Sequence, residues 1–77
     1  MTPYANSNGG SGVTGYEIRR EAIVVEFRHG GKYLYDYRTT GETHVEEMKV
    51  LALEGRGLAT YINKHVRNLY AEKLSEL

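Results

Sequence analysis

The 77 residues carry ten basic and ten acidic side chains and no cysteine. This length allows one domain, and the missing cysteine excludes disulfides and any zinc site built with cysteine. The zero formal charge argues against a generic duplex-DNA binder, which normally shows a basic excess.

No apolar run in the sequence approaches the ~20 residues of a membrane span. The N-terminus also lacks a charged segment followed by an apolar one, as a secretory signal would have. We therefore expect a soluble, cytoplasmic protein with no membrane association.

The first 12 residues, MTPYANSNGGSG, are mostly Asn, Ser and Gly with two isolated large apolar side chains. Such a segment cannot bury enough apolar surface to offset the entropy lost on ordering. We predict a disordered tail over residues 1–12 and a single folded domain over residues 13–77.

Three β-strands are expected next, in VTGYEI, AIVVEF and KYLYDYR, which are rich in β-branched and aromatic residues. An HGG segment separates the last two and favours a hairpin turn, because glycine tolerates positive φ. Pairing across this turn places Tyr33 and Tyr35 on one face with Ile23, Val25 and Phe27. That face is the more apolar one, so we expect it to lie under helices.

The spacing of apolar residues then becomes helical. Thr43 and Glu46 form a capping-box pattern at the predicted start of a first helix, and Gly55 fits the position that ends it. A second apolar stripe predicts a second helix: Leu58, Ile62, Val66 and Leu69. The predicted fold is α+β, a three-stranded antiparallel β-meander followed by two α-helices packed on one face (β-β-β-α-α).

A spaced set of aromatic, apolar and glycine residues runs through this domain: Tyr16, Ile23-x-Val25-x-Phe27, Gly30, Tyr33-Leu34-Tyr35, Gly55, Leu58 and Ile62. Between about residues 13 and 70 the pattern resembles the KTSC domain, a small module similar to one at the C-terminus of some lysyl-tRNA synthetases. The chain has Leu53 and Ala59 where the family usually has serine and asparagine. The resemblance implies the α+β fold and RNA binding, the role suggested for the family.

The tyrosines of the third strand allow two interpretations. They are either core residues whose hydroxyls reach the surface, or a platform on which bases of a single-stranded nucleic acid stack. Tyr37 lies nearest the strand end and is the most accessible of them, so Tyr35, Tyr37 and the adjacent Arg38 are candidate ligand contacts.

Basic residues gather in the second helical segment. Lys64 and Arg67 share an exposed side, which is either an ordinary solvated face or a patch that positions phosphates. Arg56 and Gly57 join the two helices, where backbone N–H groups could hold an anion or simply start a helix. These four residues complete the predicted binding site.

Catalytic and metal-binding patterns are missing from the sequence. His29, His44 and His65 match no metal motif by their spacing, and Asp36, the only aspartate, has no recognisable catalytic partner. We predict no metal site, no cofactor and no enzymatic activity.

The opposite face of the predicted sheet carries Val24 and Leu34, which no predicted helix covers. They are either scattered surface residues or the contact of a homodimer. The expected function is a small non-catalytic binding module for RNA or a nucleotide-like ligand. The alternative is a homo-oligomeric protein-interaction module, or an oligomer that sequesters a small nucleotide.

Overall fold

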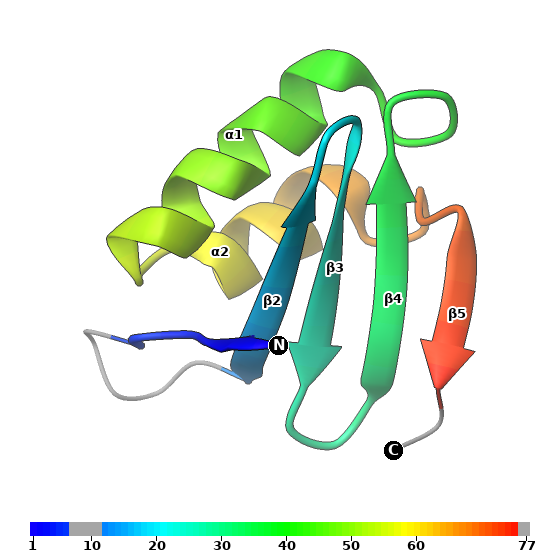
Figure 1. Ribbon diagram of the computed structural model, residues 1–77. Coiled ribbons are helices and arrows are strands. Elements are labelled where there is room, and N and C mark those ends of the chain that lie inside the picture. The colour runs from blue at the N-terminus through cyan, green and yellow to red at the C-terminus, as the bar shows by residue number, and fades with distance from the viewer. Residues whose placement is uncertain (7–11, 76–77) are drawn as a thin grey trace.

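The structure is a computed structural model that describes residues 1–6 and 12–75. Its elements in chain order are β1 (Thr2–Pro3), β2 (Val13–Arg19), β3 (Ala22–Phe27), β4 (Gly31–Asp36), α1 (Glu42–Glu54), α2 (Leu58–Tyr61), the π-helical turn η1 (Ile62–Val66) and β5 (Glu72–Ser75). One antiparallel sheet has the order β1-β2-β3-β4-β5, and the helices lie on one side of it (Figure 1). The α+β class is confirmed. Within the described residues, no helix is long and apolar enough to cross a membrane.

The pairing of β3 with β4 sets the core. Ile23 lies opposite Tyr35 and Val25 opposite Tyr33, which confirms the face predicted from the sequence. Ile23 and Val25 are fully buried, and Tyr35 is 2% exposed. The core is completed by residues of the helices and of the first strands: Tyr4, Val13, Tyr16, Val45, Met48, Ala52, Leu58, Ile62 and Val66.

Helix α1 begins two residues earlier than the capping-box pattern predicts, because that pattern makes Thr43 the N-cap. Its N-cap is Gly41, which has φ 107°, and no side chain caps the helix, so Thr43 lies inside it. Glycine adopts this φ at no steric cost, so the chain can turn into the helix at residue 41. The end is as predicted, because Gly55 adopts the left-handed conformation and its N–H bonds the carbonyls of Leu51 and Ala52.

The second helical segment is shorter than the apolar stripe predicts. Leu58, Ile62 and Val66 are buried as expected, but Leu69 is 41% exposed. The segment changes from α2 to η1 at Ile62 and ends at Val66, so Leu69 lies past the last helical residue.

Two strands were not predicted, so the sheet has five strands rather than three. At the C-terminal edge, β5 pairs with β4, and the Ala71 N–H donates to the Leu34 carbonyl at 2.7 Å. A four-residue exposed strand carries too little hydrophobic alternation to be recognised, and its partner lies far away in sequence.

The other unpredicted strand lies in the segment expected to be a disordered tail over residues 1–12. Thr2 pairs with Tyr16 and Pro3 with Gly15 in β1, and Tyr4 is 6% exposed in the core. The Leu58 N–H donates to the Tyr4 hydroxyl at 3.3 Å. A single buried aromatic ring with a bonded polar tip anchors this end of the chain. Residues 7–11 of the predicted tail lie outside the described residues.

We predict that Tyr4→Ala lowers the free energy of unfolding by about 3–5 kcal/mol, the usual cost of deleting a buried aromatic ring. Tyr4→Phe should cost about 1–3 kcal/mol, because it leaves the Leu58 N–H without its acceptor. Urea unfolding followed by circular dichroism measures both values. Thr2→Ala, an exposed site in the same strand, is the control and should change stability by less than ~0.5 kcal/mol. Equal effects at Thr2 and Tyr4 would contradict the anchoring role.

Candidate functional site

A cleft of about 290 Å³ lies between the helix-covered face of the sheet and the segment from η1 to β5. Five apolar or aromatic residues line it, namely Phe27, Tyr33, Tyr35, Ile62 and Tyr70. Three polar residues line it as well, namely Asn63, Arg67 and Asn68. A hollow that joins aromatic rings to a few polar groups can hold a ligand.

The aromatic wall of the cleft is held by edge-to-face contacts. The Tyr33 ring lies between Phe27, at 5.7 Å and 81°, and Tyr70, at 4.8 Å and 71°, measured between ring centroids and planes. Lys73 Nζ lies 5.3 Å from the Tyr33 ring centroid, a cation–π distance. These contacts hold the Phe27, Tyr33 and Tyr70 rings against one another.

Tyr35 serves both the core and the cleft. Its side chain is almost fully buried, yet it is one of the lining residues. Burial, followed by the nearby Tyr33 and Tyr70 phenols, raises the pKa of Tyr35 above its ordinary value. The hydroxyl therefore stays protonated and can donate a hydrogen bond. The burial of the ring agrees with the core interpretation of Tyr35, and a ligand contact through its hydroxyl stays a prediction.

The polar wall comes from η1 and the turn after it. Ile62 and Val66 face the core, which leaves Asn63 and Arg67 exposed, and Asn68 follows directly. The described lining residues include one ionised group, the Arg67 guanidinium, and no carboxylate. The cleft therefore combines aromatic rings with a single positive charge.

Of the predicted site residues, the structure places Tyr35 and Arg67 in the cleft. Sequence reasoning missed Asn63, Asn68 and Tyr70 as site residues. The spacing of Asn63 four residues before Arg67 is a signal that could have been used, because such residues share a helix face. No sequence signal brings Tyr70 to Tyr33, since their contact depends on the unpredicted strand β5.

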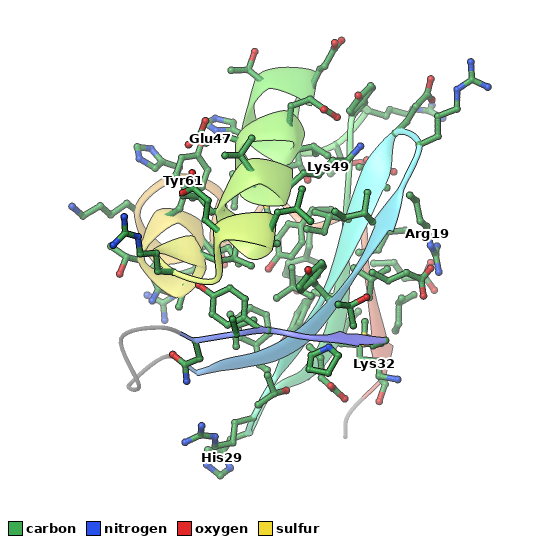
Figure 2. All side chains as sticks on the ribbon, turned by 60° about the vertical axis from the view of Figure 1, so that its left-hand side comes forward. Arg19, His29, Lys32, Glu47, Lys49 and Tyr61 are labelled. Carbon is green, nitrogen blue, oxygen red and sulfur yellow. The ribbon has the colours of Figure 1, made fainter. Side chains whose placement is uncertain are left out.

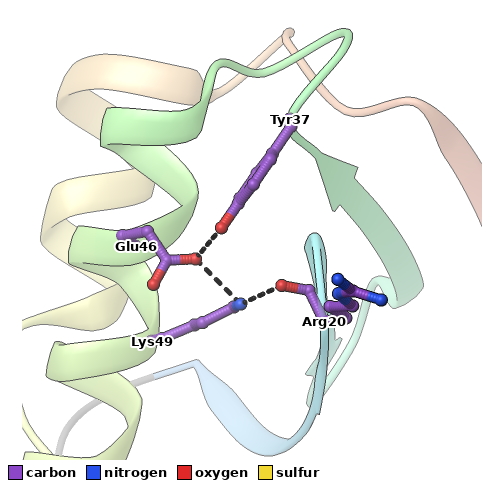
Figure 3. Close-up of polar contacts among 4 residues, drawn as sticks. All are labelled: Arg20, Tyr37, Glu46 and Lys49. Atoms are coloured by element: carbon purple, nitrogen blue, oxygen red, sulfur yellow. Dashed lines mark hydrogen bonds and ion pairs between the residues drawn. The ribbon is translucent and has the colours of Figure 1, made fainter.

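Tyr37 is used inside the molecule instead. Its hydroxyl donates to Glu46 Oε2 at 2.5 Å, and Glu46 also pairs with Lys49 at 2.8 Å (Figure 3). Lys49 Nζ in turn donates to the Arg20 carbonyl at 3.0 Å. The network ties α1 to the end of β4 and to the β2–β3 turn, so Tyr37 acts as a brace between layers.

The hydrogen bonds of Tyr37 and Glu46 shift the pKa values of both side chains. The hydrogen bond to Glu46, with smaller effects of desolvation and charge, raises the pKa of Tyr37 to about 12. Hydrogen bonds from Lys49 and Tyr37 lower the pKa of Glu46 below its ordinary value. Both shifts favour the charge states in which the phenol donates to a carboxylate.

Arg38 lies on the opposite face of the sheet. There it lines a second hollow of about 420 Å³ together with Arg19, Glu21, Ala22, Leu34, Asp36 and Tyr37. Figure 2 shows Arg19 on the side of the sheet away from the helices. Two acidic and two basic side chains line this hollow, so its charge does not select an anion.

The remaining predicted contacts lie outside the cleft. Gly57 has φ 82° and starts α2, and the first N–H of that helix is already bonded to the Tyr4 hydroxyl. Arg56 is exposed beside it, and Lys64 is exposed on η1; neither lines the cleft. The sequence expectation of one site holding all these residues is therefore not realised in the fold.

A ring cluster joins α1 to the second helical segment. His44 Nδ1 and Tyr61 Oη are hydrogen bonded at 2.7 Å, and the Tyr61 and His65 ring centroids lie 4.5 Å apart. Burial, followed by the charge of Glu47, raises the pKa of Tyr61. Glu47 and Tyr61 lie on the helical side of the molecule (Figure 2). Among the described residues, no group of three or more His, Cys, Asp or Glu is placed to hold a metal.

Val24, the predicted interface residue, is 2% exposed. It lies in one row of the sheet between Glu17 and Leu34, with Glu72 beyond Leu34. Since paired residues share a face, Glu17 and Leu34 flank Val24 directly. Val24 could add little contact area to a homodimer, and the interface stays a prediction that rests on Leu34.

Comparisons with protein-family models, with curated proteins and with solved structures find no match to this chain. The resemblance to the KTSC domain therefore stays a prediction.

We predict that Val24→Lys lowers the free energy of unfolding by several kcal/mol, because a lysine does not fit the buried volume of Val24 and its charge would lose water there. Leu34→Lys, at a half-buried position in the same row, should cost less. Thermal unfolding and size-exclusion chromatography together decide between the core and interface roles. A Val24→Lys protein with unchanged stability and an altered oligomeric state would show that the interface role is correct.

We also predict that Glu46→Gln lowers the pKa of Tyr37 from about 12 toward 10. In the wild type this raised pKa stabilises the fold fully below pH 10, and the contribution is lost as pH rises through about 12. Ring NMR signals of Tyr37 recorded through the alkaline range measure the shift. Glu47→Gln is the matched control, because Glu47 is not among the groups that raise this pKa. An unchanged Tyr37 pKa in the Glu46→Gln protein would contradict the hydrogen bond between Tyr37 and Glu46.

Proposed function

We propose that this chain is a small non-catalytic binding module for a nucleotide unit, either free or within single-stranded RNA. The observation that carries the proposal is that aromatic rings and the Arg67 guanidinium line one cleft. Bases stack on aromatic side chains, and the planar guanidinium pairs with phosphate through two parallel hydrogen bonds.

The size of the cleft supports a single base. Its volume of about 290 Å³ lies just below the ~300–1,000 Å³ usual for ligand pockets. Phe27, Tyr33 and Tyr70 supply ring surfaces, while Asn63 and Asn68 supply groups that can bond the edge of a base. A base inserted there would leave its sugar and phosphate at the polar wall.

Charge near the cleft favours an anionic ligand of modest affinity. Arg67 lines the cleft, Lys73 lies over the Tyr33 ring, and Lys64 is exposed one turn before Arg67. Few phosphate contacts are available, so binding should be weak and should fall as salt rises.

The proposal is a binding role because the described lining residues pair no nucleophile with a general base. The hydroxyl of Tyr35 is held in its protonated form by burial, which suits a hydrogen-bond donor. The cleft can therefore hold and orient a ligand through groups that do not need to ionise.

We predict that Arg67→Gln weakens binding of a nucleoside monophosphate about tenfold and flattens its salt dependence, because one phosphate contact is lost. Tyr70→Ala should weaken binding about 5- to 150-fold, the equivalent of losing ~1–3 kcal/mol of stacking. Amide NMR titrations at low salt measure the dissociation constants. A short single-stranded RNA titrated in parallel tests whether the natural ligand is free or polymeric.

Arg38→Gln is the matched control, because it removes the same charge from the opposite face. It should leave binding unchanged. Equal losses of nucleotide affinity in Arg38→Gln and Arg67→Gln would point to a nonspecific charge effect and contradict binding in the cleft. Amide spectra that do not move with either ligand at low salt would reject the proposed function.

A further inference from the structure

We infer that His44 and His65 together bind one divalent transition-metal ion such as Zn²⁺. The fold brings their imidazole rings together from two elements, His44 from α1 and His65 from η1. The ring centroids lie 5.9 Å apart, and the ring planes differ by 26°. Neither residue is among the described lining residues of the cleft, so the inference is independent of the proposed function.

The sequence prediction of no metal site rested on the spacing of the histidines along the chain, which matches no metal motif. Spacing along the chain does not report residues that meet through tertiary packing. In the structure, the Tyr61 ring lies beside both histidines, with its centroid 5.8 Å from that of His44 and 4.5 Å from that of His65. The two imidazoles are therefore held in one cluster between α1 and the second helical segment.

A hydrogen bond orients the His44 ring for metal binding. His44 Nδ1 and Tyr61 Oη lie 2.7 Å apart. When Nδ1–H donates to the hydroxyl, the second ring nitrogen, Nε2, carries the lone pair that a metal needs. Histidines that bind metals almost always have such a partner on the other nitrogen, because it fixes the tautomer and the direction of the ring. Tyr61 is therefore a positioning residue of the proposed site.

The separation of the two rings suits a single ion. Zinc bonds imidazole nitrogen at about 2.0–2.1 Å, so two rings around one tetrahedral ion have centroids roughly 5 Å apart. The observed 5.9 Å is slightly longer, and the exposed side chain of His65 can rotate to close the difference. Glu47 follows His44 by one turn of α1, and its charge acts on Tyr61, so a negative charge lies near the proposed cation.

The chemistry of the two ligands selects the class of ion. Imidazole suits zinc, copper and nickel, whereas calcium and magnesium prefer oxygen ligands. The described residues place no group of three or more His, Cys, Asp or Glu to hold a metal, so water would complete the coordination. Two protein ligands should bind more weakly than the closed four-ligand sites of structural zinc proteins. We therefore expect one saturable site of modest affinity.

The experiment titrates the folded wild-type chain with Zn²⁺ alone and follows the imidazole NMR signals of all three histidines. The signals of His44 and His65 should shift together, with one shared dissociation constant. His29 is exposed in the turn between β3 and β4 and is the internal control, whose signals should stay in place over the same range. If all three histidines respond with the same dissociation constant, the binding is adventitious and the inference is overturned.

Two variants test whether the histidines act as a pair. His65→Ala removes an exposed side chain, so the fold should be kept, and amide spectra recorded before zinc is added verify this. The zinc-dependent shift of His44 should be lost in this protein over the range that saturates the wild type. His29→Ala is the matched control and should leave the shift of His44 unchanged. A wild-type response of His44 in the His65→Ala protein would overturn the shared site.

The role of the orienting hydroxyl has its own test. Tyr61→Phe keeps the aromatic ring and removes the hydrogen bond to His44 Nδ1. It should weaken zinc binding about tenfold, the lower end of the usual effect of removing the partner of a metal-binding histidine. Tyr70→Phe, which removes a hydroxyl outside the ring cluster, should leave zinc affinity unchanged. Wild-type zinc affinity in the Tyr61→Phe protein would overturn the positioning role of Tyr61.

Discussion

The register between β3 and β4 is the constraint on which the rest of the structure depends. Because side chains alternate along a strand, a slip of one residue would turn Tyr33 and Tyr35 to the opposite face. The core would lose Tyr35, and the cleft would lose two of its rings at the same time. Gly31, with φ 82°, sits at the start of β4 and lets the tight turn keep this register.

The cleft is a product of tertiary folding. Its rings from β3 and β4 meet residues of η1 and of the segment before β5, which lie some thirty residues later in the chain. The chain turns back after η1 because β5 pairs with β4, and this return brings Tyr70 against Tyr33. The rare π-helical turn lies where Asn63 begins the polar wall, in keeping with the frequent association of such turns with functional sites.

Long patterned segments were predictable and short or contact-dependent features were not. The alternation through Ile23, Val25 and Phe27 and the stripe from Leu58 to Val66 gave the central strands and the helices, because burial repeats at a fixed period there. Strands β1 and β5 are too short to show a period. The role of Tyr37 could not be read from its strand, because its partner Glu46 belongs to a helix. Two of the eight described lining residues, Tyr35 and Arg67, were predicted as site residues, whereas Tyr70 required the fifth strand.

The brevity of the outer strands has a consequence for self-association. Strand β1 pairs through two residues only, and the next part of β2 carries an ion pair between Glu17 and Arg19 at 2.6 Å. At the other edge, β5 has four described residues, with Glu72 and Lys73 among them. Short edges that carry charge give a further chain little backbone to pair with. The sheet therefore resists growing into the extended intermolecular sheets of amyloid, although the domain is built around five paired strands.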